Sequence, residues 1–126
     1  MAESMADGRR ALGALGEQVA VEHLVALGFE VVERNWRCRL GEIDVVAREG
    51  AVLVAVEVKT RRSAATGHPL EAITPAKAAR LRTRLARWLA THDVHAPQVR
   101  LDAVAVWAGR GAGDAHRVEH VRGIGW

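Results

Sequence analysis

Two apolar segments joined by a short turn constrain the fold of this chain more than any other feature. Residues 43–47 (IDVVA) and 51–56 (AVLVAV) have the β-branched, apolar character of strands, and Glu49-Gly50 between them is typical of a hairpin turn. The first segment contains Asp44, and the second runs directly into Glu57-Val58-Lys59. Charged side chains are rarely buried without partners. The sequence therefore predicts a β-hairpin with a polar site at its open end.

The register of this hairpin decides which side chains meet. A two-residue loop at Glu49-Gly50 places Glu42 opposite Glu57. Because side chains alternate between the faces of a sheet, we expect one face to carry Glu42, Asp44, Glu57 and Lys59. Asp44 and Glu57 then become diagonal neighbours, about 7 to 8 Å apart at the backbone, and their carboxylates can converge on one cation. A slip of one residue would separate them.

An ordinary ion pair is the alternative interpretation of Glu57 and Lys59, with Asp44 as a surface acid near the turn. Against it stands the rarity of lysine in the chain: of 18 basic residues, only Lys59 and Lys77 are lysines. An ammonium is a compact charge that can handle a proton, which a guanidinium does not readily do. We therefore favour a functional Lys59.

The order of these motifs resembles that of a known group of proteins. An acid on one strand, followed by Glu-x-Lys on its hairpin partner, is similar to the PD-(D/E)xK nuclease superfamily. From about Leu12 to Val121 the chain resembles the YraN family in the order of Leu15-Gly16-Glu17, Asn35-Trp36-Arg37, Gly41-Glu42-Ile43-Asp44, Val56–Arg61 and Arg100-Leu101-Asp102. Ile43 stands where the superfamily name has proline. The resemblance implies an α/β fold like that of archaeal Holliday junction resolvases: a restriction-endonuclease-like α/β/α core with a mixed central sheet of about five strands, flanked by helices.

The same resemblance implies hydrolysis of nucleic-acid phosphodiesters with Mg²⁺ or Mn²⁺ as cofactor, on branched or single-stranded DNA. Asp44, Glu57, the Val58 carbonyl and Glu17 are then expected to hold the metal in oxygen coordination. Lys59 would orient or deprotonate the attacking water and stabilise the transition state. Junction cleavage would favour a homodimer.

Glu17 has two interpretations. We expect a helix over 11–27, with Gly28 as its stop, and Glu17 at the edge of its apolar stripe. There it can reach the sheet, and it is the residue that matches the helical glutamate of the resolvase-like branch. The alternative is a first-turn acid that is favoured by the helix dipole.

Several basic residues are candidates for contact with a nucleic-acid backbone. They are Arg61, Arg62, Arg37, Arg39 and Lys77. Arginine and lysine neutralise phosphates without reading sequence, and the pI near 10.0 permits such a partner. The formal net charge is only +3, however, and charged helix faces are usually just solvated. A second helix should begin at Thr74-Pro75 and bury a stripe of Ala78, Leu81, Leu85, Trp88 and Leu89.

The remaining features fit a small domain. At 126 residues, a single domain over 11–126 can bury its own core, preceded by a flexible tail over 1–10. Further strands are expected over 29–36, 99–107 and 117–121, with a loop over 60–69. We expect Asp102 either to support the site or, as the favoured role, to pair with a neighbouring arginine. Apolar stretches are strand-length and no secretory signal is visible, so the chain is expected in the cytoplasm. One cysteine, Cys38, excludes an internal disulfide.

Two other functions remain open from the sequence. One is a nucleic-acid-binding module with a nuclease fold and no catalysis, and the other is an assembly scaffold. Geometry should distinguish them from an enzyme. A shared cation between Asp44 and Glu57 favours catalysis, whereas diverging side chains, or a site plugged by Arg34 or Arg39, favour binding alone.

Overall fold

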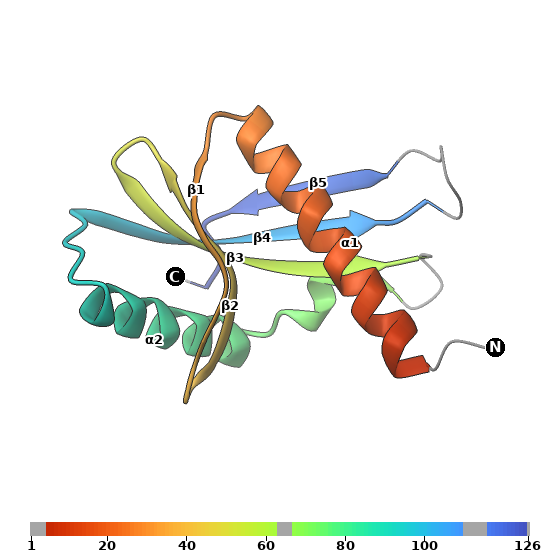
Figure 1. The fold of residues 1–126 in the computed structure, drawn as a ribbon, viewed down its shortest axis with the longest axis horizontal. Coiled ribbons are helices and arrows are strands. Elements are labelled where there is room, and N and C mark those ends of the chain that lie inside the picture. The colour runs from red at the N-terminus through yellow and green to blue at the C-terminus, as the bar shows by residue number, and fades with distance from the viewer. Residues whose placement is uncertain (1–4, 63–66, 110–115, 126) are drawn as a thin grey trace.

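The computed structural model describes residues 5–62, 67–109 and 116–125. A five-stranded mixed sheet, in the order β1-β2-β3-β4-β5, lies between two helices (Figure 1). In chain order the elements are α1 (Met5–Ala26), β1 (Glu30–Cys38), β2 (Gly41–Glu49), β3 (Val52–Arg61), the short 3-10 helix η2 (Pro69–Ala72), α2 (Pro75–Thr91), β4 (Gln98–Trp107) and β5 (Arg117–Arg122). Strands β3 and β4 are parallel, and the other pairs are antiparallel. The expected α/β fold is confirmed.

The two helices cover opposite faces of the sheet, and each face has its own apolar core. On the α1 side, Val54 and Val56 of β3 pack with Leu24. On the α2 side, Leu53 and Ala55 of the same strand pack in the cluster that contains Leu81, Leu85 and Trp88. Burial on both faces explains why this strand reads as a continuous apolar run.

Helix α2 follows the prediction closely. Thr74 caps it by accepting a hydrogen bond from the Lys77 N–H at 3.2 Å, and Pro75 occupies the first turn. The predicted stripe is buried, except that Leu89 is only half-buried. No helix in the part of the chain that the structure describes is long and apolar enough to cross a membrane.

Helix α1 begins at Met5, before the predicted start at Ala11. Residues 5–10, which were expected to belong to a tail, are therefore helical, while residues 1–4 lie outside the described residues. Gly8 lies inside this helix, where a glycine costs only about 1 kcal/mol relative to alanine. Asp7 in the first turn favours the helix, and it lies 3.7 Å from Arg10.

The hairpin register differs from the predicted one by two residues. Arg48 pairs with Leu53 rather than with Ala51, and Glu49 pairs with Val52. The turn is therefore Gly50-Ala51, with Gly50 at φ 60° in its first position. Glycine is favoured there because side chains seldom adopt positive φ. The predicted loop at Glu49-Gly50 was wrong for this reason.

An irregularity in β1 and β2 overturns the predicted single face. Ile43 belongs to the α2-side core and Val45 to the α1-side core, although strict alternation would place them together. The interruption is at Asp44, and Asn35 beside it on β1 has φ 53°, a conformation that asparagine tolerates. Glu42 and Asp44 consequently face α1. Their carboxylates lie close to a carboxylate of that helix. Glu57 and Lys59 instead line a cavity against α2.

A buried ionic network ties β4 to its neighbours away from this irregularity. Asp102 is completely buried and accepts hydrogen bonds from Arg100 Nε at 2.7 Å, His120 Nε2 at 2.9 Å and the Gly123 N–H at 3.1 Å. Arg100 also donates to Glu49 Oε1 at 2.7 Å. Pairing of Asp102 with a neighbouring arginine is therefore confirmed. Burial by itself would raise the pKa of Asp102, but the hydrogen bonds outweigh it and lower the pKa.

Helix α1 packs tightly against β3 at Gly16. This residue is buried, and a Cβ atom on it would overlap the Thr60 side chain. Gly13, one turn earlier, has nothing within 4 Å of an added Cβ. The absence of a side chain at 16 thus sets the distance between α1 and the sheet, and with it the position of Glu17.

We expect Asp102→Asn to lower the free energy of unfolding by about 3 kcal/mol or more, because it leaves Arg100 and His120 beside a neutral amide. Urea unfolding at pH 7 measures this. Asp93→Asn makes the same change at an exposed position and should change stability by less than about 0.5 kcal/mol. Equal losses in the two variants would contradict a stabilising role for the buried network.

Gly16→Ala should destabilise the fold by about 1 to 3 kcal/mol, since the added methyl group forces α1 away from Thr60. Gly13→Ala is the matched control on the same helix. It should stabilise the protein by about 0.5 to 1 kcal/mol, because alanine favours helix and the space is open. Urea unfolding of both variants tests the pair, and a stabilising Gly16→Ala is the result that the close contact forbids.

Candidate metal centre

Three carboxylates from two elements meet beside the irregularity of the sheet. Glu17 comes from α1, and Glu42 and Asp44 come from β2. One oxygen from each lies within 4.8 Å of the others, and all three residues are half-buried. Oxygen atoms of carboxylates are the ligands that hard divalent cations prefer. This acid cluster, Glu17, Glu42 and Asp44, could hold a metal ion.

Local structure fixes the position of each acid. Asp44 Oδ2 accepts a hydrogen bond from the Val58 N–H at 2.8 Å, so that the side chain bridges the diverging ends of β2 and β3. Asn35 of β1, which has a positive φ, hydrogen-bonds to Glu17. Val58 thus contacts Asp44 through its N–H, and the expected role of its carbonyl as a metal ligand stays a prediction.

The carboxylates disfavour one another's ionised form. The pKa of Asp44 is raised to about 7, first by burial and then by repulsion from Glu57, against a lowering by the Val58 hydrogen bond. Burial also raises the pKa of Glu17, the Asn35 hydrogen bond opposes this, and Glu42 adds repulsion. A cation at the cluster would relieve this repulsion, so the donor set fits a divalent metal.

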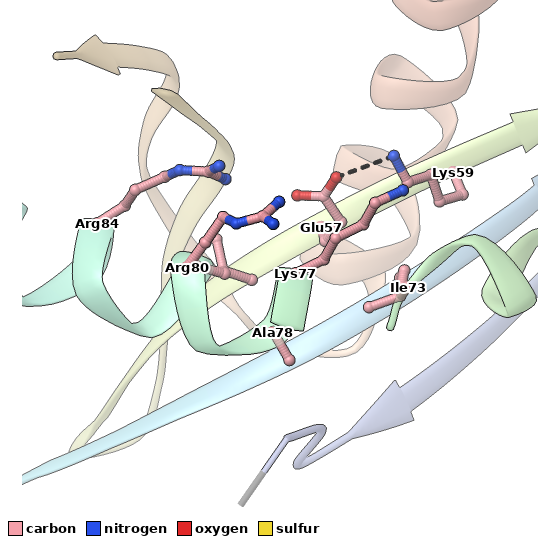
Figure 2. Close-up of a pocket in the computed structure, with 8 residues that line it drawn as sticks. Glu57, Lys59, Ile73, Lys77, Ala78, Arg80 and Arg84 are labelled. Atoms are coloured by element: carbon pink, nitrogen blue, oxygen red, sulfur yellow. Dashed lines mark ion pairs between the residues drawn. The ribbon is translucent and has the colours of Figure 1, made fainter. Parts of the chain in front are cut away.

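Glu57 and Lys59 lie on the other side of β3. Lys59 Nζ is 3.2 Å from Glu57 Oε1, the ion pair considered as the alternative from sequence. Both line a cavity of about 210 Å³ between β3 and α2 (Figure 2). The remaining lining residues are Ile73, Lys77, Ala78, Arg80, Leu81 and Arg84. Glu57 is outside the acid cluster, yet its charge acts on Asp44, so the two sites are adjacent.

Arg84 joins the cavity to the acid cluster. Its Nε donates to the Leu40 carbonyl at 2.9 Å, and its Nη1 donates to the Glu42 carbonyl at 3.2 Å. A Cβ on Gly41 would lie 2.7 Å from Arg84 Nε, and this glycine has φ 124°. Helix α2 thus holds the turn between β1 and β2 and the backbone of Glu42.

The predicted nucleic-acid contacts divide between the two sides of β3. Arg61 and Arg62 line a second cavity of about 430 Å³ on the α1 side, together with Glu17. Lys77 lines the cavity on the α2 side. Arg39 is exposed in the turn between β1 and β2, and Arg37 Nε is 3.9 Å from Glu42 Oε2.

Sequence reasoning left two residues out of the candidate site. Glu42 was placed on the expected polar face but not among the metal ligands, although it lies two residues before Asp44. Asn35 was noted only as part of a motif. Its signal was an asparagine inside an otherwise strand-forming segment, a residue type that tolerates the left-handed conformation.

Comparison with known proteins places these residues inside one matched region. A model of the uncharacterised protein family UPF0102 matches residues 16–106. A UPF0102 protein of Beutenbergia cavernae is 62% identical over 115 residues, which cover 91% of this chain and 96% of the relative. One from Kineococcus radiotolerans is 56% identical over 115 residues, covering 90% and 93%. A third, from Streptomyces coelicolor, is 50% identical over 120 residues, covering 94% and 91%.

In the metal-free protein, Asp44 should make stability fall as pH rises from about 4 to about 7. Its pKa is near 3.8 when unfolded and about 7 when folded, so the folded state binds the extra proton in this range. The contribution has a slope of about 1.4 kcal/mol per pH unit. Asp44→Asn should remove it, as measured by urea unfolding in EDTA at several pH values.

Asp93→Asn is the control, because it makes the same change at an exposed position. Its stability should keep the pH dependence of the unaltered protein. Parallel profiles for Asp44→Asn and the unaltered protein would show that the acid cluster does not hold a proton on Asp44.

Proposed function

The chain belongs to the uncharacterised protein family UPF0102, and we propose that it hydrolyses phosphodiester bonds of nucleic acid with a divalent cation. The observation that carries this proposal is the acid cluster of Glu17, Glu42 and Asp44. A lysine and further cations lie directly behind it, across β3. Acids that could hold a metal, next to a cationic cavity, suit metal-dependent phosphodiester hydrolysis.

The acid cluster would hold Mg²⁺ or Mn²⁺ through oxygen ligands. Glu57 would approach the same ion from the α2 side, consistent with its effect on the pKa of Asp44. Bound there, the metal supplies a Lewis acid that polarises a phosphoryl oxygen and lowers the pKa of water. The Val58 N–H keeps Asp44 oriented, and Asn35 keeps Glu17 oriented.

Hydrolysis forms a bond from a water oxygen to phosphorus and breaks the bond from phosphorus to the leaving oxygen, which takes up a proton. Lys59 would donate to a phosphate oxygen or hold the attacking water, and its ion pair with Glu57 positions its Nζ. Nearby cations in the α2-side cavity would offset the negative charge that the substrate brings. DNA, branched or single-stranded, is the substrate class that we propose.

Cleavage of junction, flap, duplex and single-stranded DNA with Mg²⁺ or Mn²⁺ tests the activity. Asp44→Asn and Lys59→Ala should each reduce the cleavage rate by at least about 100-fold, since they remove a metal ligand and a phosphate contact. Circular dichroism and thermal melting verify the fold. Cutting retained by both purified variants would refute the assigned site.

Metal binding is tested separately through the melting temperature. Mn²⁺ should raise it in the unaltered protein, and Glu17→Gln should reduce the rise. Glu22→Gln replaces an exposed acid on the same helix and should leave it unchanged. A rise that is equal in all three proteins would place the metal elsewhere.

A nucleic-acid-binding module without catalysis is the second candidate function. The observation in its favour is that Glu57 faces α2 and pairs with Lys59, away from the acid cluster. Neither arginine forms an ion pair with the acid cluster among the described residues: Arg34 donates to Gln18 at 3.0 Å and acts on Glu17 only through its charge, and Arg39 is exposed. DNA binding without cleavage in any metal would select this candidate.

A further inference from the structure

Helix α2 carries a row of basic side chains that extends beyond the cavity behind the acid cluster. Its members, at spacings of three, four and three residues, are Lys77, Arg80, Arg84 and Arg87. We propose that this row binds the phosphate backbone of one single-stranded segment of nucleic acid and directs that strand toward Lys59. This inference rests on the proposed function for its substrate class.

The spacing places the row on one side of the helix. At 3.6 residues per turn, residues three and four apart are neighbours, and ten residues span about 15 Å along the axis. The buried stripe of α2 lies beside the row, so the cations flank the sheet rather than point directly away from it. Figure 2 shows Lys77, Arg80 and Arg84 projecting from α2 toward the side of the cavity where Glu57 lies.

Most of these cations are unpaired. Within residues 5–62, 67–109 and 116–125, no carboxylate lies within ion-pair distance of Lys77, Arg80 or Arg87, and all three are exposed. Arg100 and Arg122 of the same chain, by contrast, both bind Glu49. Unpaired cations in one row repel each other, and an anionic chain that lies along them removes this repulsion.

Arg84 differs from the rest of the row. Two of its nitrogen atoms already donate to the carbonyls of Leu40 and Glu42. It therefore places the turn between β1 and β2 against the row, and this turn carries the exposed Arg39. The row therefore has β3 on one side, and this turn contacts it near its middle, at Arg84.

A single strand fits these boundaries better than a duplex. The cations form one row, whereas a duplex presents two backbones on a stiff rod. The ion pair of Glu57 and Lys59 lines the same cavity as Lys77, Arg80 and Arg84, and a flexible strand can bend into it. Nearby apolar contacts come from Ile73 and Leu81 rather than from aromatic rings, so the contact should be independent of base sequence.

Fluorescence anisotropy with a labelled 20-nucleotide single strand, in EDTA and over a range of NaCl concentrations, tests the row. Lys77→Gln, Arg80→Gln and Arg87→Gln should each weaken binding and reduce the slope of log K against log salt by about 0.7. The triple variant should lose about 2 from the slope. Arg84 is left unchanged because of its contacts with the turn.

Arg82→Gln is the control on the same helix. Arg82 lies on another side of α2 and donates to the Gly125 carbonyl at 2.7 Å, so its loss should leave the salt slope unchanged. A blunt duplex of the same length should bind more weakly than the single strand. Circular dichroism and melting temperature verify that the variants fold.

An unchanged slope in the triple variant would overturn the inference, and so would an equal loss in Arg82→Gln or tighter binding of the duplex. These results are separable from failure of the proposed function. Binding in EDTA does not need a metal at the acid cluster, so it is measured independently of cleavage. A protein that binds through the row but cuts nothing would retain this inference and lose the enzymatic one.

Discussion

The hydrogen bond from the Val58 N–H to Asp44 holds the open end of the hairpin together. Regular pairing of β2 with β3 runs from Glu49 and Val52 to Val45 and Val56. Beyond that point a carboxylate oxygen replaces the carbonyl that a continuing ladder would have supplied. The strands can therefore diverge without leaving this N–H unsatisfied, and the diverging end gives α1 access to the polar edge of the sheet.

Strand β3 has a different set of charged groups on each side at this end. The acid cluster lies on its α1 side together with Arg61 and Arg62, and the cations of α2 lie on its other side. Glu57 is the exception, since it lies among the cations and still acts on Asp44. With this arrangement, groups suited to a metal and groups suited to a phosphate lie close together on the two sides of one strand.

The parts of the structure that were predictable depended on local chemistry. Thr74 and Pro75 gave the start of α2 because a cap and a first-turn proline act within one turn. The register was not predictable in the same way, because either pair of residues around Gly50 can form a turn, and the actual φ of that glycine decides. The side on which Asp44 lies changes at the break between Ile43 and Val45, next to the positive φ of Asn35, which no local pattern fixes, whereas Glu57 follows the regular alternation of β3. Strict alternation along the strands therefore grouped acids that the fold separates.

The single side chain of Arg84 connects helix α2 to the turn between β1 and β2. Its guanidinium donates to the carbonyls of Leu40 and Glu42 from α2, a helix that comes after both β2 and β3 in the chain. A lysine here would offer a single nitrogen centre and no planar fork, so it would not reproduce both contacts in the same geometry. The register of α2 against the turn is thus set by a directional contact rather than by apolar packing alone. A rotation of α2 about its axis would shift the main chain next to Glu42 along with its row of cations.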